Sequence, residues 1–122
     1  MKAILCQAHG LPASLSFSQI PVPAFGPDDV LIQVKACGVN YPDVLMIQNK
    51  YQFKPPMPFS PGGEVAGEVA NVGENVKHIK VGDRVVALCG WGGFAEYVVV
   101  RAARVFQIPA TLGYIQAAGT LY

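Results

Sequence analysis

The side chains best suited to chemistry lie in two short segments separated by a proline-rich stretch. The first segment contains Asn40, whose amide offers two hydrogen-bond donors and an acceptor, and the acid Asp43. The second contains Glu64, directly after a pair of glycines. Fixed donors can stabilise negative charge that develops on an oxygen atom during a reaction. A purely structural role is also open for Asn40 and Asp43, because asparagine caps helices well and the helix dipole favours an acid in the first turn.

The remaining polar residues do not form a metal-binding pattern. A catalytic zinc ion needs about three Cys, His or carboxylate ligands that converge on one point. The two histidines, His9 and His78, lie in predicted turns, where exposure to solvent is the usual state. The three cysteines are widely spaced, and Cys6 and Cys89 belong to apolar runs that are typical of a core. We therefore expect neither a catalytic nor a structural zinc site.

Length and composition indicate one soluble globular domain. The chain has 122 residues, of which 52% are hydrophobic and 14% charged, and its formal net charge is +1. These values exclude a disordered chain and give no electrostatic footprint for nucleic acid or an acidic membrane. No apolar run has the length of a signal peptide or a membrane span, and the odd number of dispersed cysteines favours a reducing compartment. The resulting expectation is a cytoplasmic location.

The elements that must position these side chains are mainly short strands. Alternation of apolar and polar residues predicts strands at 2–6, 15–20, 29–37, 64–72, 84–89, 94–100 and 104–108. Pro42 is compatible with the first turn of a short helix over 43–48. Residues 51–61, with four prolines, predict a structured loop, and the mildly helical tail from 112 to 122 is expected to stop before it could pack as a full element. Many short strands with little helix indicate a β-barrel or sandwich.

Four motifs, in this order and at this spacing, carry a family resemblance. They are CGVNYPD at 37–43, PGGEVAG at 61–67, GDRV at 82–85 and GGFAEY at 92–97. The chain resembles the N-terminal, GroES-like catalytic domain of the medium-chain dehydrogenase/reductase superfamily. The resemblance implies a mainly β fold over residues 1–110, a GroES-like partly open β-barrel with one or two short helices. Residues 111–122 would begin the connection to a Rossmann domain that is absent from the chain as given.

The same motifs resemble the zinc-independent, quinone oxidoreductase-like branch of that superfamily. Its zinc-dependent members have cysteine and histidine where this sequence has Asn40 and Gly63. The resemblance implies an NADPH-dependent oxidoreductase that transfers hydride, without a metal, to a quinone or enone, and a homodimer for the full-length protein. This fragment alone is expected to bind NADPH weakly and to be inactive, because a Gly-rich turn in the Rossmann domain holds the phosphates.

The resemblance also implies roles for individual residues. It gives catalytic roles to Asn40, Asp43 and Tyr51, and cofactor contacts to Asn40, Tyr41 and Asp43. Tyr51 would line the acceptor pocket, or alternatively it is a loop aromatic that covers the core. A second pocket tyrosine of some members corresponds to Leu45, which would make the pocket more apolar. A different class of function stays open as well, a non-catalytic GroES-like binding or assembly module of the kind found in co-chaperonins.

Overall fold

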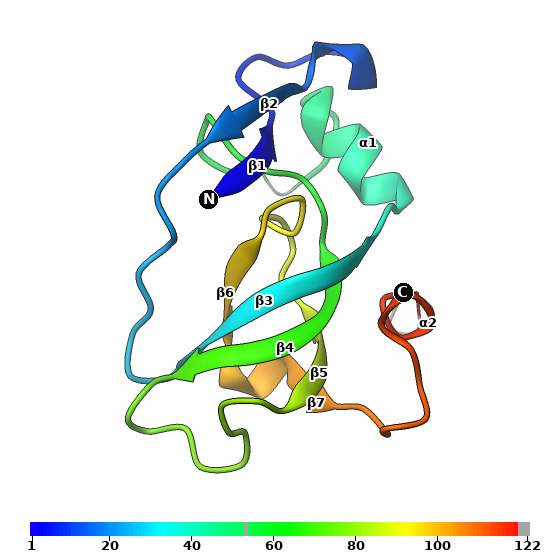
Figure 1. The fold of residues 1–122 in the computed structure, drawn as a ribbon. Helices are drawn as coiled ribbons and strands as arrows, with labels where there is room; N and C mark the ends of the chain where they lie inside the picture. Colours follow the sequence, from blue (N-terminus) through cyan, green and yellow to red (C-terminus); the bar gives the residue numbers. More distant parts are fainter. Residues whose placement is uncertain (53, 120–122) are drawn as a thin grey trace.

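The computed structural model describes residues 1–52 and 54–119, and its main element is a five-stranded antiparallel sheet (Figure 1). The strands, in spatial order, are β6 (Tyr97–Arg101), β3 (Asp29–Gly38), β4 (Glu64–Val72), β5 (Arg84–Leu88) and β7 (Val105–Gln107). A separate two-stranded sheet consists of β1 (Lys2–Leu5) and β2 (Ser16–Gln19). The helices are α1 (Tyr41–Ile47), α2 (Tyr114–Ala117) and two 3₁₀ turns, η1 (Pro12–Ser14) and η2 (Ala102–Arg104).

The predicted class, a mainly β, partly open barrel with one or two short helices, is confirmed. Within residues 1–52 and 54–119 the large sheet does not close on itself, since β6 and β7 form its two edges. Six of the seven predicted strands are present with their ends within one residue of the prediction. The strand expected over 94–100 begins only at Tyr97, because the residues before it pair with β1 instead. There the Ile4 N–H donates to the Phe94 carbonyl over 2.8 Å.

The pairing of β3 with β4 forms the centre of the sheet and aligns the two segments that carry candidate chemistry. Its register ends with Gly38 opposite Glu64. The register shifts at two places along β3, and beside the second shift Gly67 approaches the backbone of Gln33 so closely that a Cβ atom would overlap the Gln33 carbonyl oxygen. Glycine is therefore required at 67 for the register that brings the end of β3 beside Glu64.

The main hydrophobic core consists largely of β-branched residues that alternate along the strands. Such residues suit a pleated surface with one buried face. The buried members are Val30, Ile32, Val65, Val69, Ile79, Val85, Ala87, Val98, Val100 and Val105. Cys6 is fully buried, as predicted, but in a different cluster, whereas Cys89 is only half-buried at the margin of the main core.

The small sheet and α1 lie together at one end of the large sheet (Figure 1). Isolated bridges from Ala3 to Ala95 and from Cys6 to Phe59 tie the first strand to the rest of the molecule. A second apolar cluster joins these elements, and its buried members are Cys6, Met46, Ile47 and Phe59. In the part of the chain that the structure describes, none of the helices has the length and hydropathy needed to cross a membrane.

Helix α2 lies beside β3 and β4, and Figure 1 shows it to the right of the large sheet. Its end buries two alanines against the sheet, and this third cluster consists of Ala66, Val86, Ala117 and Ala118. The mildly helical tail that was expected is thus a helix of only four residues, and its end does pack on the sheet because small side chains on both partners allow close approach. Residues 120–122 of the predicted tail lie outside the described residues.

Candidate functional site

The side chain of Asp43 joins the two chemistry-bearing segments. One carboxylate oxygen accepts a hydrogen bond from the Asn40 backbone N–H over 2.8 Å, and the other accepts one from the Gly62 N–H over 3.1 Å. The first bond is half of a helix-capping arrangement, since Asn40 is the N-cap of α1 and Asp43 is its third residue. The second bond reaches across to the loop that leads into β4. One buried acid thus fixes the start of α1 relative to the start of β4.

Burial dominates the electrostatics of this carboxyl group. Asp43 is 4% exposed, and burial raises its pKa above the ordinary value, while hydrogen bonds from the N–H groups of Asn40, Gly62 and Gly63 oppose that rise. Both carboxylate oxygens of Asp43 already accept hydrogen bonds from backbone N–H groups. The geometry therefore favours a role for Asp43 in holding Asn40 in place over direct contact with a ligand.

The side chain of Asn40 lies in a crowded polar corner at the end of β3, which is formed by Gly38, Glu64 and the Ala118 carbonyl group. A Cβ atom on Gly38 would stand 2.8 Å from the Ala118 carbonyl oxygen, 3.3 Å from Glu64 Oε1 and 3.4 Å from Asn40 Nδ2. Glu64 itself is fully buried. The Asn40 Nδ2 atom is also buried, and no hydrogen-bond acceptor among the described residues pairs with it. Capping at the start of α1 needs acceptor oxygens, so it makes no use of the amide N–H donors of Asn40.

The two tyrosines that were predicted to share the site with Asn40, Tyr41 and Tyr51, lie in different surroundings. Tyr41 is 73% exposed in the first turn of α1. Tyr51 is half-buried and packs against the second apolar cluster, which includes Met46 and Phe59. This placement matches the interpretation of Tyr51 as a loop aromatic that covers a core. Asn40 and Asp43 are therefore the predicted pair that the fold brings into direct contact.

Arg84 is a polar anchor that sequence reasoning missed. Its guanidinium donates to the carbonyl oxygens of Pro109, over 2.9 Å, and Leu112, over 2.7 Å. The same group lies 4.5 Å from the centre of the Tyr114 ring, within the range of a cation–π contact. The available signal in the sequence is the GDRV motif, which contains this arginine. Arg84 holds the segment that leads into α2 against the sheet.

Two half-buried thiols lie close to the same corner. The Cys37 sulfur lies near the α-carbons of Gly62 and Gly93, and the Cys89 sulfur lies 3.3 Å from the Gly62 carbonyl oxygen. Burial, with smaller contributions from Cys89 and Asp43, raises the pKa of Cys37 to about 12, and burial raises the pKa of Cys89 to about 12. Both groups are therefore protonated at neutral pH and are poor nucleophiles. Among residues 1–52 and 54–119 no three His, Cys, Asp or Glu side chains gather where they could hold a metal ion.

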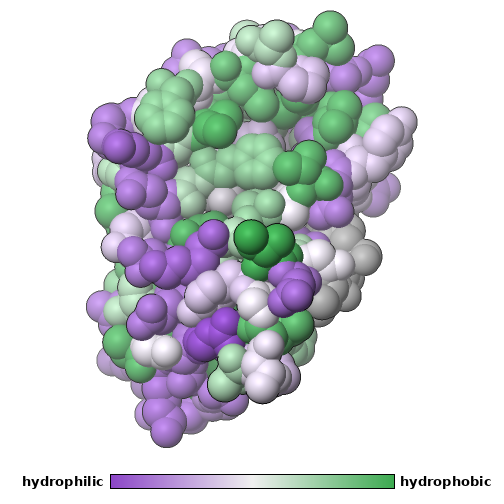
Figure 2. All heavy atoms as spheres, turned by 45° about the vertical axis from the view of Figure 1, so that its right-hand side comes forward, coloured by the Kyte–Doolittle hydropathy of each residue, from purple (hydrophilic) through white to green (hydrophobic). Residues whose placement is uncertain are grey.

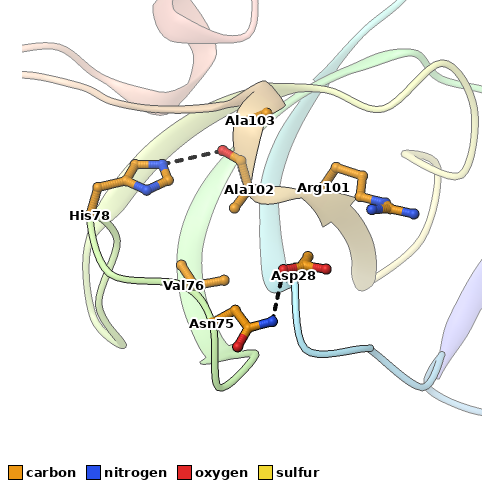
Figure 3. Close-up of a pocket in the computed structure, with 7 residues that line it drawn as sticks. All are labelled: Asp28, Asn75, Val76, His78, Arg101, Ala102 and Ala103. Atoms are coloured by element: carbon orange, nitrogen blue, oxygen red, sulfur yellow. Dashed lines mark hydrogen bonds between the residues drawn. The ribbon is translucent and has the colours of Figure 1, made fainter.

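A polar cavity of about 240 Å³ lies at the opposite end of β3 (Figure 3). Its polar groups mostly pair with one another: Asn75 Nδ2 donates to Asp28 over 3.1 Å, and a His78 ring nitrogen lies 3.3 Å from the Ala102 carbonyl oxygen. Figure 3 shows the Arg101 side chain directed away from both pairs. These contacts fasten loops to each other, and the cavity lies far from Asn40 along the strand.

Apolar side chains gather on the side of the molecule that carries α1 and α2. Figure 2, which turns this side forward, shows apolar side chains gathered across a shallow hollow between the upper and lower parts. A small apolar cavity of about 80 Å³ lies beside Asp43, lined in addition by Pro12, Leu15, Val39, Val44, Ile47, Pro61 and Phe94. Val39 and Ile115 are 73% and 85% exposed, so large apolar groups face solvent on this side. Such surface suits an apolar partner or ligand.

Comparison with known proteins identifies the domain family of the chain. Residues 26–110 match the family model of the alcohol dehydrogenase GroES-like domain. A quinone oxidoreductase-like protein 2 homolog from Nematostella vectensis is 38% identical over 118 residues, which are 96% of this chain and 32% of that protein. The chain thus spans about a third of the length of this curated relative.

Solved structures give the same result. The human synaptic vesicle membrane protein VAT-1 homolog-like protein superposes with a TM-score of 0.92 at 31% identity, over 97% of this chain and 38% of that chain. Escherichia coli quinone oxidoreductase, solved as a complex with NADPH, superposes with a TM-score of 0.90 at 32% identity, over 98% of this chain and 37% of that chain. The matched family model, the partly open barrel and the order of its motifs agree, and the chain belongs to the alcohol dehydrogenase GroES-like domain family.

Proposed function

We propose that the complete protein containing this domain is an NADPH-dependent reductase of quinones or enones, and that residues 1–110 form the wall that receives the acceptor. Residues 111–122 would begin the connection to a dinucleotide-binding domain. The observation that carries the proposal is the buried Asn40 Nδ2 atom, which has no acceptor among the described residues. A buried donor without a partner costs about 1–3 kcal/mol, so an arrangement that keeps one is expected to use it.

NADPH, when bound, supplies a hydride, and one proton from solvent completes the reduction of a quinone to a hydroquinone. The contribution of this chain is to the acceptor. Asn40 would donate an amide hydrogen bond to the acceptor oxygen as negative charge develops there. Asp43 would hold Asn40 in position through its bond to the Asn40 N–H. Tyr41, with its exposed ring, would offer a flat surface to the nicotinamide.

The acceptor pocket would be mostly apolar. Tyr51 is the proposed aromatic wall, and Leu45 takes the place of a second tyrosine that some related enzymes have. No step is proposed through a metal, since Asn40 and Gly63 stand where zinc-dependent relatives carry ligands. For the complete protein we also propose a cytoplasmic homodimer. Residues 1–122 alone would bind NADPH weakly and show no turnover, which isothermal titration and an activity assay of this fragment would test.

The decisive experiment measures NADPH oxidation by the complete protein with a quinone and with an enone. Asn40→Ala should lower kcat/KM for the acceptor by about 10²–10³-fold, as loss of one donor to a developing oxyanion does. Asn71→Ala is the matched control, because Asn71 is exposed on β4 and bonds only locally, to the N–H of Val72. Full activity of Asn40→Ala would remove the basis of the proposal.

Two further measurements separate the alternatives. Metal analysis of the purified protein should find no stoichiometric zinc, and about one zinc ion per chain would contradict the metal-free route. Size-exclusion chromatography should give a small oligomer. A ring of several subunits without any reductase activity would instead indicate the assembly module.

A further inference from the structure

We propose that Arg84 is a positioning residue for this reaction, which acts on Asn40 through the segment 109–118. This inference rests on the proposed function, since it assigns to Arg84 the alignment of the amide donor. Arg84 lies at the start of β5, one strand beyond β4, and does not contact Asn40 through any hydrogen bond in the described residues. Its effect must therefore be carried by the segment that it holds.

Arg84 clamps the approach to α2 through its contacts with Pro109, Leu112 and Tyr114. The two terminal nitrogens of Arg84 bond separate carbonyl oxygens, those of Pro109 and Leu112, three residues apart. The plane of the same group covers the Tyr114 ring at 4.5 Å. A planar guanidinium can satisfy two carbonyls and one ring at once, and a lysine ammonium cannot reproduce that fork. The clamp thus fixes the approach to α2 at three points.

The far end of the clamped segment, Ala117 and Ala118, lies against the sheet. Ala117 and Ala118 are 0% and 3% exposed and pack against Ala66 and Val86. The Ala118 carbonyl oxygen then stands 2.8 Å from where a Cβ atom of Gly38 would lie. The backbone of the segment therefore forms one wall of the corner that encloses the Asn40 amide.

Loss of the Arg84 contacts would leave the segment 109–118 held mainly by small apolar side chains. Apolar contacts between alanines are small, so they give weak resistance to sliding of α2 over the sheet. If the Ala118 carbonyl moves away, the Asn40 amide gains room to rotate and water gains access to it. Misplacement of a reacting group by about 1 Å can cost up to roughly 100-fold in rate. Arg84 would thus set the rate of reduction without touching the acceptor.

The test compares three variants of the complete protein in the acceptor assay. Arg84→Met should lower kcat by about tenfold or more, with KM for NADPH much less affected, because the clamp orients the donor and does not hold the phosphates. Arg84→Lys should recover only part of the loss, since it keeps the charge but not the fork. Arg101→Met is the matched control: it removes an arginine that is exposed and distant, with one ion pair to Asp29 at 3.7 Å, and it should leave kcat unchanged.

A double-mutant cycle distinguishes positioning from general loss of stability. If Arg84 acts through Asn40, Arg84→Met should cause little further loss of kcat in the Asn40→Ala background. Equal losses of kcat in both backgrounds would overturn the proposal. If Arg84→Met does not fold, the same cycle with Arg84→Lys decides the question.

A readout that needs no turnover keeps this inference separable from the proposed function. The side-chain amide signal of Asn40, recorded by NMR with isotope-labelled asparagine and assigned by its loss in Asn40→Ala, should shift and exchange faster with water in Arg84→Met. The signals of Asn71 and Asn75 should not change. An unmoved Asn40 signal would overturn the inference even in an active enzyme, whereas a shifted signal in a protein that reduces no quinone or enone would support the clamp and contradict the function.

Discussion

The Asp43 carboxylate accepts a 3.1 Å hydrogen bond from the backbone N–H of Gly62, nineteen residues further along the chain. This bond is the direct link between helix α1 and the loop that enters β4. It also explains why an acid stands in the third position of so short a helix. A cap alone would need one oxygen of the carboxylate, and here the second oxygen is used by a distant segment.

Replacement of Asp43 by asparagine should destabilise the fold. An amide presents one acceptor and turns its NH₂ group toward a backbone N–H, so at least one buried donor loses its partner. We expect a loss of about 1–3 kcal/mol in the free energy of unfolding, measured by denaturant titration.

Asp83→Asn is the control for this substitution. Asp83 also accepts two hydrogen bonds, from the N–H of Lys80 and from Gln107 Nε2, but at the surface. Asp83→Asn should therefore lower the free energy of unfolding clearly less than Asp43→Asn does. Equal losses of unfolding free energy in Asp43→Asn and Asp83→Asn would show that burial does not increase the contribution of the Asp43 hydrogen bonds to stability.

Gly38→Ala should displace α2. The new methyl group would stand 2.8 Å from the Ala118 carbonyl oxygen, which is backbone and cannot turn aside. We expect a loss of about 1–3 kcal/mol in unfolding free energy, as for overpacked cores, together with faster hydrogen exchange at residues 117–118.

Gly119→Ala serves as the comparison, since the nearest atom to its Cβ would be 3.8 Å away, a normal contact. It should leave both measurements unchanged. A fully stable Gly38→Ala variant with unaltered exchange would mean that α2 does not press on this corner in solution.

Gly67→Ala should be the most damaging single methyl addition in the sheet. A Cβ atom there would overlap the Gln33 carbonyl oxygen at the bulge between β3 and β4. The two central strands would have to separate or shift register. We expect a loss of more than about 4 kcal/mol or failure to fold, seen in circular dichroism and expression as soluble protein. A soluble variant with wild-type melting temperature would contradict the described register.

Cys37 and Cys89 should resist alkylation in the folded protein until strongly alkaline pH. Burial is the main reason that both thiols have a pKa of about 12, above the ordinary value of 9.0. The unfolded chain therefore ionises first as pH rises. The stability that these thiols contribute is complete below about pH 9 and is lost as pH rises toward 12.

The measurement is the rate of iodoacetamide labelling, followed by mass spectrometry of each cysteine peptide at mildly alkaline pH. Labelling of Cys37 and Cys89 should be much slower in native protein than in denaturant. Comparable rates in the two states would show that neither thiol is held in the protonated form by the fold.

Local patterns were sufficient for most of the secondary structure. Alternation along residues 29–37 predicts β3 because a half-buried strand has a period of two, and the same rule places β4 and β5 within one residue. The start of β6 was not predictable in this way. Residues 94–96 have the composition of a strand, but two of their backbone hydrogen bonds go to β1, a pairing between segments about ninety residues apart.

The candidate site shows the same difference between local interactions, which the sequence predicts, and contacts between distant segments, which it does not. The residue types and their order determined that Asn40 and Asp43 share the start of a helix, since capping is a local interaction that spans three residues. Only the tertiary structure decided which of their atoms stay available. Both Asp43 oxygens accept backbone hydrogen bonds, one of them from the distant Gly62, and the buried Asn40 Nδ2 atom has no acceptor among the described residues.

The parts that depend on distant contacts were decided by the fold alone. Tyr51 packs on an apolar cluster, and Arg84 reaches the carbonyl oxygens of Pro109 and Leu112, more than twenty residues away. No periodicity within a segment encodes such pairings, because they arise only when β3, β4 and β5 lie side by side and α2 folds back over them. The sequence thus determined the class of domain and the place of Asn40 at the start of a helix, and the packing of the sheet determined the surroundings of its amide group.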